Sequence, residues 1–295
     1  MKLKVKFNLM LVSVFALALG TSGYLSREQL NENARHEVLV NAGVLMETIL
    51  SARNWAVFEV GPNLRETEED EFLMMGVPAY ASKKIMESVQ KRYPEYGYRE
   101  VALNPTNPKD RPVEWEKKIV NQFRSDPTKV EDWGVRKTSA GSFLYLARPI
   151  KIEKSGCLGC HTTPDKSPPA MVKLYGEDYG YGWKLKEIIG AQIVSVPLAV
   201  PEANAERTFI TFMTTLTSVF VVLFVLINLM LTKFVTGPLG KMSKAADEIS
   251  TGNMKIAEFS EAGGDEVAQL GAAFNRMKRS LEKAMALFYS SSDQK

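Results

Sequence analysis

The sequence is poor in cysteine and histidine, the nitrogen and sulfur ligands of structural zinc sites. It has two cysteines and two histidines in 295 residues, and apart from a single short motif only His36 remains, with no ligand-type spacing near it. A structural zinc ion needs four nitrogen or sulfur ligands, so a zinc site is not expected. Long runs of Lys and Arg are also missing and the net charge is only +3. No nucleic-acid partner is therefore expected.

Charged residues are also missing from two stretches long enough to cross a membrane. The first, 7–26, matches the roughly twenty residues that span a hydrocarbon core of about 30 Å. It follows Lys2, Lys4 and Lys6, which places the N-terminus in the cytoplasm by the positive-inside rule. A cleaved signal peptide ending near residues 16–18 is the alternative reading. Both readings export the segment that follows.

The second uncharged stretch, 208–232, is apolar on every face and is predicted to return the chain to the cytoplasm. The protein is thus expected to be a multi-pass protein of the bacterial inner membrane. The predicted layout is a cytoplasmic N-terminus (1–6), a first transmembrane helix (7–26), a periplasmic domain (27–207), a second transmembrane helix (208–232), a cytoplasmic segment (233–289) and a tail (290–295).

Both cysteines lie in one motif inside the exported segment, Cys157-Leu158-Gly159-Cys160-His161. This spacing is the signature of c-type haem attachment, in which two thiols add to the vinyl groups and the adjacent imidazole binds the iron. One covalent haem c per chain is predicted, with Cys157, Cys160 and His161 as its binding residues. A plain disulfide is the remaining alternative, whereas a thioredoxin-like pair would open a helix after a strand and the flanking residues are typical of a loop.

The exported segment has the pattern of an α+β domain in which a long N-terminal helix packs on an antiparallel sheet. A helix is predicted over 27–60, shorter helices over 80–93 and 114–123, and strands over 97–103, 142–150 and 188–198. The acidic run 66–71 is predicted to be a solvated loop. The haem motif falls between the last two strands, ahead of an aromatic stretch (175–183) that either walls the porphyrin or packs as core.

The sixth ligand of the iron is left open by the sequence. Met46 is the first candidate, because it lies mid-stripe on the long helix and follows the small residues Ala42 and Gly43. Arg53, two turns on, could pair with a haem propionate. His36 is the second candidate, and an open position that binds a diatomic gas is the third. Further methionines at 74, 75, 86 and 171 complete the set, and core packing is the ordinary role of such residues.

The segment after the second apolar stretch has two heptad seams separated by a break at 250–253. Their apolar positions step by three and four residues: Leu239, Met242, Ala246 and Ile249, then Val267, Leu270, Phe274, Met277, Leu281, Ala284 and Phe288. One chain cannot bury both seams, so a homodimer is expected. With Pro238 near its start and Asp265-Glu266 opening its second helix, residues 235–289 resemble a HAMP signalling domain. By that resemblance, Pro238 and Glu266 respond to transmembrane movement.

Residues 30–200 resemble a family of c-type haem domains with a PAS-like fold, formerly a domain of unknown function and first characterised in cyanobacteria. The resemblance rests on Arg53-Asn54-Trp55, on 103–108 followed by Glu114-Trp115-Glu116, and on the haem motif ahead of 190–197. It implies sensing of redox state or of small ligands. One member type uses a cysteine as distal ligand, and this chain has none to spare.

The expected function is a membrane-anchored haem sensor that relays a periplasmic redox or small-ligand signal through HAMP. The chain shows no kinase, cyclase or methyl-accepting segment, so a cytoplasmic signalling protein is expected to act in trans, and outside the membrane a redox partner or a diatomic gas is the expected stimulus. The alternative is a membrane-bound cytochrome for electron transfer. An enzyme is not expected, since no catalytic acid and base accompany the haem motif.

Overall fold

The computed structural model describes residues 3–65, 73–260 and 263–292. The acidic run 66–71 lies outside the described residues. The chain forms two compact units: Ser26–Phe209, called here the sheet unit, and Met1–Leu25 with Ile210–Lys295, called the helical unit.

Helix α1 (Leu3–Trp55) is the longest element and contributes to both units. It continues without proline as a π-helix, η1 (Ala56–Val60), and ends in α2 (Gly61–Arg65). Within the sheet unit the buried residues of α1 recur at helical spacing, and they are Ala34, Val38, Ala42, Met46 and Ile49. The predicted helix over 27–60 is confirmed and extends toward the N-terminus as one uninterrupted helix.

The sheet has four antiparallel strands in the order β1-β4-β3-β2: β1 (Gly97–Ala102), β2 (Asp132–Thr138), β3 (Gly141–Lys151) and β4 (Ile188–Pro197). Three of these strands were predicted. Strand β2 was missed because its sequence holds a glycine and three charged residues, and such a strand survives only at the edge, where most of its side chains face solvent.

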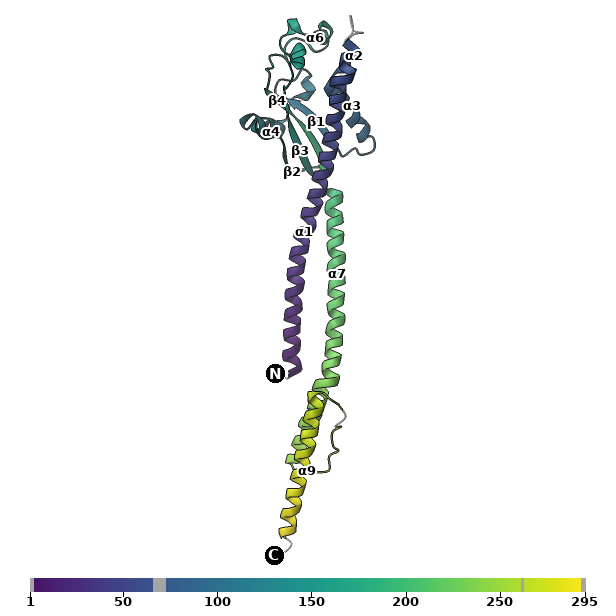
Figure 1. The fold of residues 1–295 in the computed structure, drawn as a ribbon, viewed down its shortest axis with the longest axis vertical. Helices are drawn as coiled ribbons and strands as arrows, with labels where there is room; N and C mark the ends of the chain where they lie inside the picture. The colour runs from purple at the N-terminus through teal and green to yellow at the C-terminus, as the bar shows by residue number, and fades with distance from the viewer. Residues whose placement is uncertain (1–2, 66–72, 261–262, 293–295) are drawn as a thin grey trace. The chain divides into compact units, whose positions relative to one another are not determined.

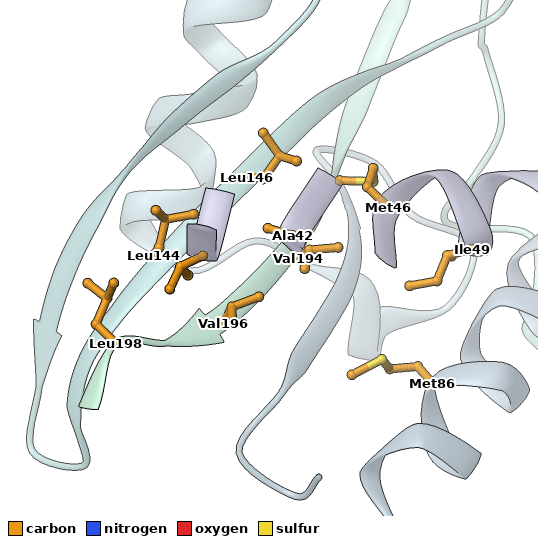
Figure 2. Packing of buried hydrophobic residues seen from close by; sticks show 10 residues of the cluster. Ala42, Met46, Ile49, Met86, Leu144, Leu146, Val194, Val196 and Leu198 are labelled. Atoms are coloured by element: carbon orange, nitrogen blue, oxygen red, sulfur yellow. The ribbon is translucent and has the colours of Figure 1, made fainter. Parts of the chain in front are cut away.

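The two faces of the sheet pack against different helices (Figure 1). On one face Leu146 and Val194 meet α1 and Met86 of α3 (Pro78–Gln90), as the close view in Figure 2 shows. On the other face Ile193 packs with Phe123 of α4 (Glu114–Ser125). Adjacent residues of β4 thus point to opposite cores, as strand geometry requires. The predicted long helix on an antiparallel sheet is confirmed.

The close approach of β1 to β4 depends on Gly190. A Cβ atom at this position would lie 1.9 Å from the carbonyl oxygen of Val101. Only glycine therefore allows the register in which Gly190 pairs with Ala102. This register fixes where β4 begins, and hence where the chain between β3 and β4 leaves the sheet.

In the helical unit, the first part of α1 packs against α7 (Ala199–Met230). Phe15 stacks on Phe220 with ring centroids 4.7 Å apart, and Gly23 admits the Met213 side chain. By length and composition, the helical stretches Leu3–Leu64 and Ala199–Ser250 are candidate membrane spans. The continuation of α7 is a π-helix, η6 (Leu231–Thr236), which runs into α8 (Gly237–Ser250).

Helix α8 is joined to α9 (Glu266–Ser292) by an extended connector. The connector is held by Asn275 of α9, whose amide donates to the carbonyl of Phe259 (2.8 Å) and accepts from its N–H (3.0 Å). Asn275 is only 1% exposed, so both hydrogen bonds are shielded from water. The predicted break after residue 250 and the second helix from Glu266 are confirmed.

Candidate haem site

The haem motif lies in an insertion between the two central strands, β3 and β4. Backbone hydrogen bonds close the base of this insertion, from Ile152 N–H to Glu187 O (2.9 Å) and from Lys186 N–H to Ile152 O (2.6 Å). Between these points the chain forms four short helices, η4 (Ser155–Cys157), α5 (Leu158–His161), η5 (Pro164–Lys166) and α6 (Pro169–Tyr175). The insertion is thus anchored at both ends to the rigid sheet.

Cys157 directly precedes the short helix α5, and Cys160 lies within it. Cys157 is exposed and Cys160 is half-buried, and no disulfide joins them in the part of the chain that the structure describes. The hydroxyl of Ser167 donates to the carbonyl oxygens of Cys160 (2.8 Å) and Thr163 (2.9 Å), which fixes the end of the short helix. Both thiols are therefore held on one structured turn, with Cys157 facing solvent.

His161 is oriented by the backbone of the aromatic stretch. Its Nδ1 lies 2.8 Å from the carbonyl oxygen of Gly180. Because a carbonyl oxygen only accepts hydrogen bonds, Nδ1 carries the proton and Nε2 keeps its lone pair. The ring stacks on Trp183 with centroids 3.8 Å apart. This is the arrangement that metal-binding histidines adopt, in which a fixed Nδ1–H leaves Nε2 for the metal.

The electrostatics of the site favour a neutral imidazole. Burial is the main reason why the pKa of His161 lies below its ordinary value, and the positive charge of Arg53 lowers it further. The hydrogen bond to Gly180 acts in the opposite direction. The neutral ring is the form that binds iron.

A clamp built on Asn104 holds the loop that orients His161. The Asn104 side chain accepts from Gly180 N–H (3.1 Å) and donates to Tyr181 O (3.0 Å), and its backbone carbonyl accepts from the Trp183 indole (3.3 Å). Gly180 has φ +88°, and a Cβ atom there would lie 2.2 Å from the hydroxyl of Thr106. Asn104 and Thr106 were predicted only as part of a turn after β1. The turn motif itself carries no signal for a contact 76 residues away.

Arg53, the predicted partner of a haem propionate, forms an ion pair with Glu100 of β1, and its pairing with a propionate stays a prediction. Glu100 is only 7% exposed, and its other oxygen accepts from the Tyr98 hydroxyl (2.8 Å). Burial and the Glu100 charge raise the pKa of Tyr98 far above its ordinary value, so Tyr98 stays a hydrogen-bond donor. The guanidinium has five N–H donors, which leaves capacity for a second acidic group.

The two candidates for the sixth ligand occupy different environments. Met46 is fully buried in the core between α1 and the sheet, among Ile49, Leu146 and Val194 (Figure 2). His36 is exposed and lies about 25 Å before Arg53 along α1, at 1.5 Å of rise per residue. The structure therefore does not bring His36 to the haem motif. Ligation by Met46 stays a prediction.

The residues at the motif fit a covalent haem. The two thiols stand on one turn, and the following imidazole has its Nδ1 satisfied and its Nε2 available. Arg53 supplies a half-buried basic side chain at the end of α1. Among the described residues, no group of three or more His, Cys, Asp or Glu side chains is arranged to hold a metal ion.

Two family models match the chain. The model described as Tll0287-like covers residues 30–197, and the HAMP domain model covers residues 230–283. The first match spans the sheet unit from α1 to the end of β4 and contains the whole haem motif. The second contains η6, α8, the connector and most of α9.

Two individual proteins are also similar. The sensor histidine kinase WalK of Bacillus subtilis (strain 168) is 34% identical over 104 residues, which are 35% of this chain and 16% of the kinase. The chain thus matches about a sixth of that relative. The crystal structure of the cyanobacterial haem protein Tll0287 superposes with a TM-score of 0.44 at 20% identity, over 55% of this chain and 95% of that one.

Proposed function

The chain belongs to the Tll0287-like family and carries a HAMP domain, and from this we propose that it is a membrane-anchored sensor with one covalent haem c. The observation that supports this best is His161, whose Nδ1 is tied to Gly180 while Nε2 is left for a metal, directly after two thiols on one helical turn. Each part of the attachment chemistry thus has a residue in place.

The residues of the motif have separate tasks in this proposal. Cys157 and Cys160 would each hold the group through a thioether, formed by addition of the thiol across one vinyl double bond with its hydrogen going to the other vinyl carbon, so that nothing is released. His161 would hold the iron through Nε2, and its ring is oriented by Gly180 and Trp183. Arg53 would pair with a propionate. The bound group supplies an iron whose oxidation state or sixth ligand can change.

The proposed topology follows the candidate spans and the charges beside them. Residues 7–26 and 208–232 cross the inner membrane, 27–207 form a PAS-like periplasmic domain, and 233–289 lie in the cytoplasm. Lysines precede the first apolar stretch and follow the second, which the positive-inside rule assigns to the cytoplasm. Alkaline phosphatase fused after residue 120 should be active, and the same enzyme fused after residue 255 should be inactive. The reverse result would refute the topology.

Chain connectivity supplies two routes from the haem motif to the membrane helices. Helix α1 carries Arg53 and runs without a break into the first apolar stretch. Strand β4 follows the haem insertion directly and ends at Pro197, two residues before α7 begins. We propose that a change of redox state or of a bound small ligand shifts α1 and β4, and that the membrane helices pass this movement to α8 through η6.

The cytoplasmic part is proposed to act as a homodimer. Leu270, Met277 and Leu281 of α9 are between 41% and 49% exposed in the single chain. A cleft of about 350 Å³ between α8, the connector and α9 is lined by Ile249, Met254 and other apolar side chains. A second copy would cover these surfaces. The dimer would then control a cytoplasmic signalling protein in trans, without itself catalysing a reaction.

Covalent attachment is tested by haem staining of the full-length protein after denaturing electrophoresis. The wild type should keep its haem, and the double variant Cys157→Ala/Cys160→Ala should lose it. His36→Ala serves as the control, since that exposed residue lies far along α1 from the motif. A wild-type protein without covalent haem, expressed with the cytochrome c maturation machinery, would refute the proposal.

Signalling is separated from electron transfer by hydrogen exchange of the full-length protein in lipid nanodiscs, oxidised and reduced. A sensor should change the exchange of α8, the connector or α9 when the iron is reduced or when carbon monoxide is added. Unchanged exchange throughout residues 237–292 would favour the alternative, a membrane-bound electron carrier.

A further inference from the structure

The end of α1 faces the segment that carries the haem motif. The ammonium group of Lys154, three residues before Cys157, lies 3.7 Å from the ring centroid of Phe58 in η1. The wide turns of a π-helix often occur at functional sites. The chain just before the motif therefore contacts η1, and a group attached at Cys157 would lie near this helix.

A second short element, η2 (Met74–Gly76), packs on this surface. It contacts both η1 and α2, and a Cβ atom at Gly76 would lie 3.6 Å from the Cα of Gly61, so the two backbones are close together. Two residues later the chain enters α3, where Lys83 binds Asp110 at 2.7 Å. Asp110 belongs to η3 (Pro108–Asp110), in the loop that follows Asn104 and Thr106. Elements on both sides of η2 thus contact the surroundings of His161.

The end of α1, η1 and η2 all carry large apolar side chains that are exposed to solvent. Trp55 at the end of α1 is 61% exposed, and Phe58 in η1 is 50% exposed. In η2, Met74 and Met75 are 38% and 57% exposed. Four large apolar side chains on packed elements are unusual for a free surface. They would instead be buried by a flat apolar macrocycle attached at the neighbouring motif.

Methionine thioethers in the described part of the sheet unit fall into two groups. Three are nearly or fully buried, at 0% to 3% exposure, and two are exposed in η2. A buried thioether such as Met46 is surrounded by aliphatic side chains and would have to leave the core to reach iron. The thioethers of η2 are exposed and are not held by core packing, so they can turn toward a bound group without disrupting the core.

We infer that η2 supplies the sixth ligand of the iron, through the sulfur of Met74 or Met75. This rests on the proposed haem attachment at Cys157, Cys160 and His161. A histidine–methionine pair raises the reduction potential of a c-type haem. With methionine bound, the sensor would respond to the oxidation state of the iron. Loss of the thioether would leave the sixth position open to a diatomic gas.

The inference is tested with isosteric Met→Leu variants of the full-length protein, which remove the sulfur and keep the volume. Oxidised protein is scanned for the weak far-red charge-transfer band of methionine-ligated ferric haem, and the reduction potential and carbon monoxide binding are measured. Met74→Leu/Met75→Leu should lose the band, lower the potential and bind carbon monoxide faster. Met46→Leu, the matched control, should keep all three wild-type properties. The two single variants then identify the ligand.

Two results would overturn the inference while leaving haem attachment intact. One is a wild type with covalent haem and no far-red band, and the other is a double variant that keeps the band, above all if Met46→Leu loses it. Absence of haem staining in the denatured wild type would instead refute the attachment itself, and the sixth-ligand inference with it.

Discussion

Replacing Arg53 with alanine removes the ion-pair partner that the described part of the chain gives to the buried carboxylate of Glu100. Glu100 has a side chain that is 7% exposed, and one of its oxygens is paired with Arg53, whose own side chain is 23% exposed. After Arg53→Ala, the Tyr98 hydroxyl at 2.8 Å would be the remaining hydrogen-bond donor to this carboxylate among those described above. The variant therefore leaves a buried negative charge without its cation.

Removing one member of a buried ion pair costs about 3 kcal/mol or somewhat more, and the partial exposure of Arg53 argues for the lower end. For a unit of this size, 1 kcal/mol shifts the melting temperature by about 2–4 °C. Arg53→Ala should therefore lower the melting temperature of the sheet unit by about 6–12 °C. Adding Glu100→Gln removes the orphaned charge, so the double variant should recover at least about half of the loss.

Tryptophan fluorescence is the suitable assay, because all four tryptophans, at positions 55, 115, 133 and 183, lie in the sheet unit. Melting curves of the full-length protein in detergent then report this unit alone. The reasoning would be refuted if Arg53→Ala melted within about 2 °C of the wild type. A double variant as unstable as Arg53→Ala would show that the cost arises from lost packing of the arginine stem and not from the charge.

Three further predictions address other contacts. Gly190→Ala should destabilise the sheet unit by about 3 kcal/mol, because the new Cβ would meet the carbonyl of β1 at 1.9 Å, whereas Gly43→Ala, with no atom within 4 Å, should leave the same melting curve unchanged or slightly raised. Asn275→Ala should cost about 2 kcal/mol and speed hydrogen exchange in the connector, whose two hydrogen bonds it removes; unchanged exchange would contradict the clamp. Gly180→Ala should alter the visible spectrum of the haem by displacing the loop that orients the imidazole, while Gly182→Ala, which also has a positive φ but no atom within 4 Å, should not; equal spectra for both would contradict the steric argument.

Much of the fold was predictable because the signals are periodic and local. The stripe of Ala42, Met46 and Ile49 indicated the buried face of α1, and the β-branched runs indicated three of the four strands. Strand β2 gave no such signal, since an edge strand with both charged and small residues is stabilised by its pairing with β3 and not by its own pattern. The break and second helix of the HAMP segment followed from heptad spacing and glycine.

Part of the candidate site could likewise be predicted from the sequence, and part could not. The sequence alone carried the prediction of covalent attachment, because two thiols and an imidazole within five residues are the signature of haem c attachment. It also predicted Arg53 as a haem-binding residue, from its position two turns after Met46 on the long helix. The sequence could not rank the methionines, because their distance from the iron depends on how segments far apart in the chain pack together.

Only the tertiary structure decided what surrounds His161. Antiparallel pairing brings the turn after β1 next to the loop before β4, so that Asn104 and Thr106 meet Gly180 and fix the proton of the imidazole on Nδ1. The same packing buries Met46 in the core and leaves Met74 exposed in η2, which contacts η1. The chemistry of the haem motif depends on residues that are neighbours in the sequence. The orientation of its histidine depends on contacts that exist only once distant parts of the chain have folded together.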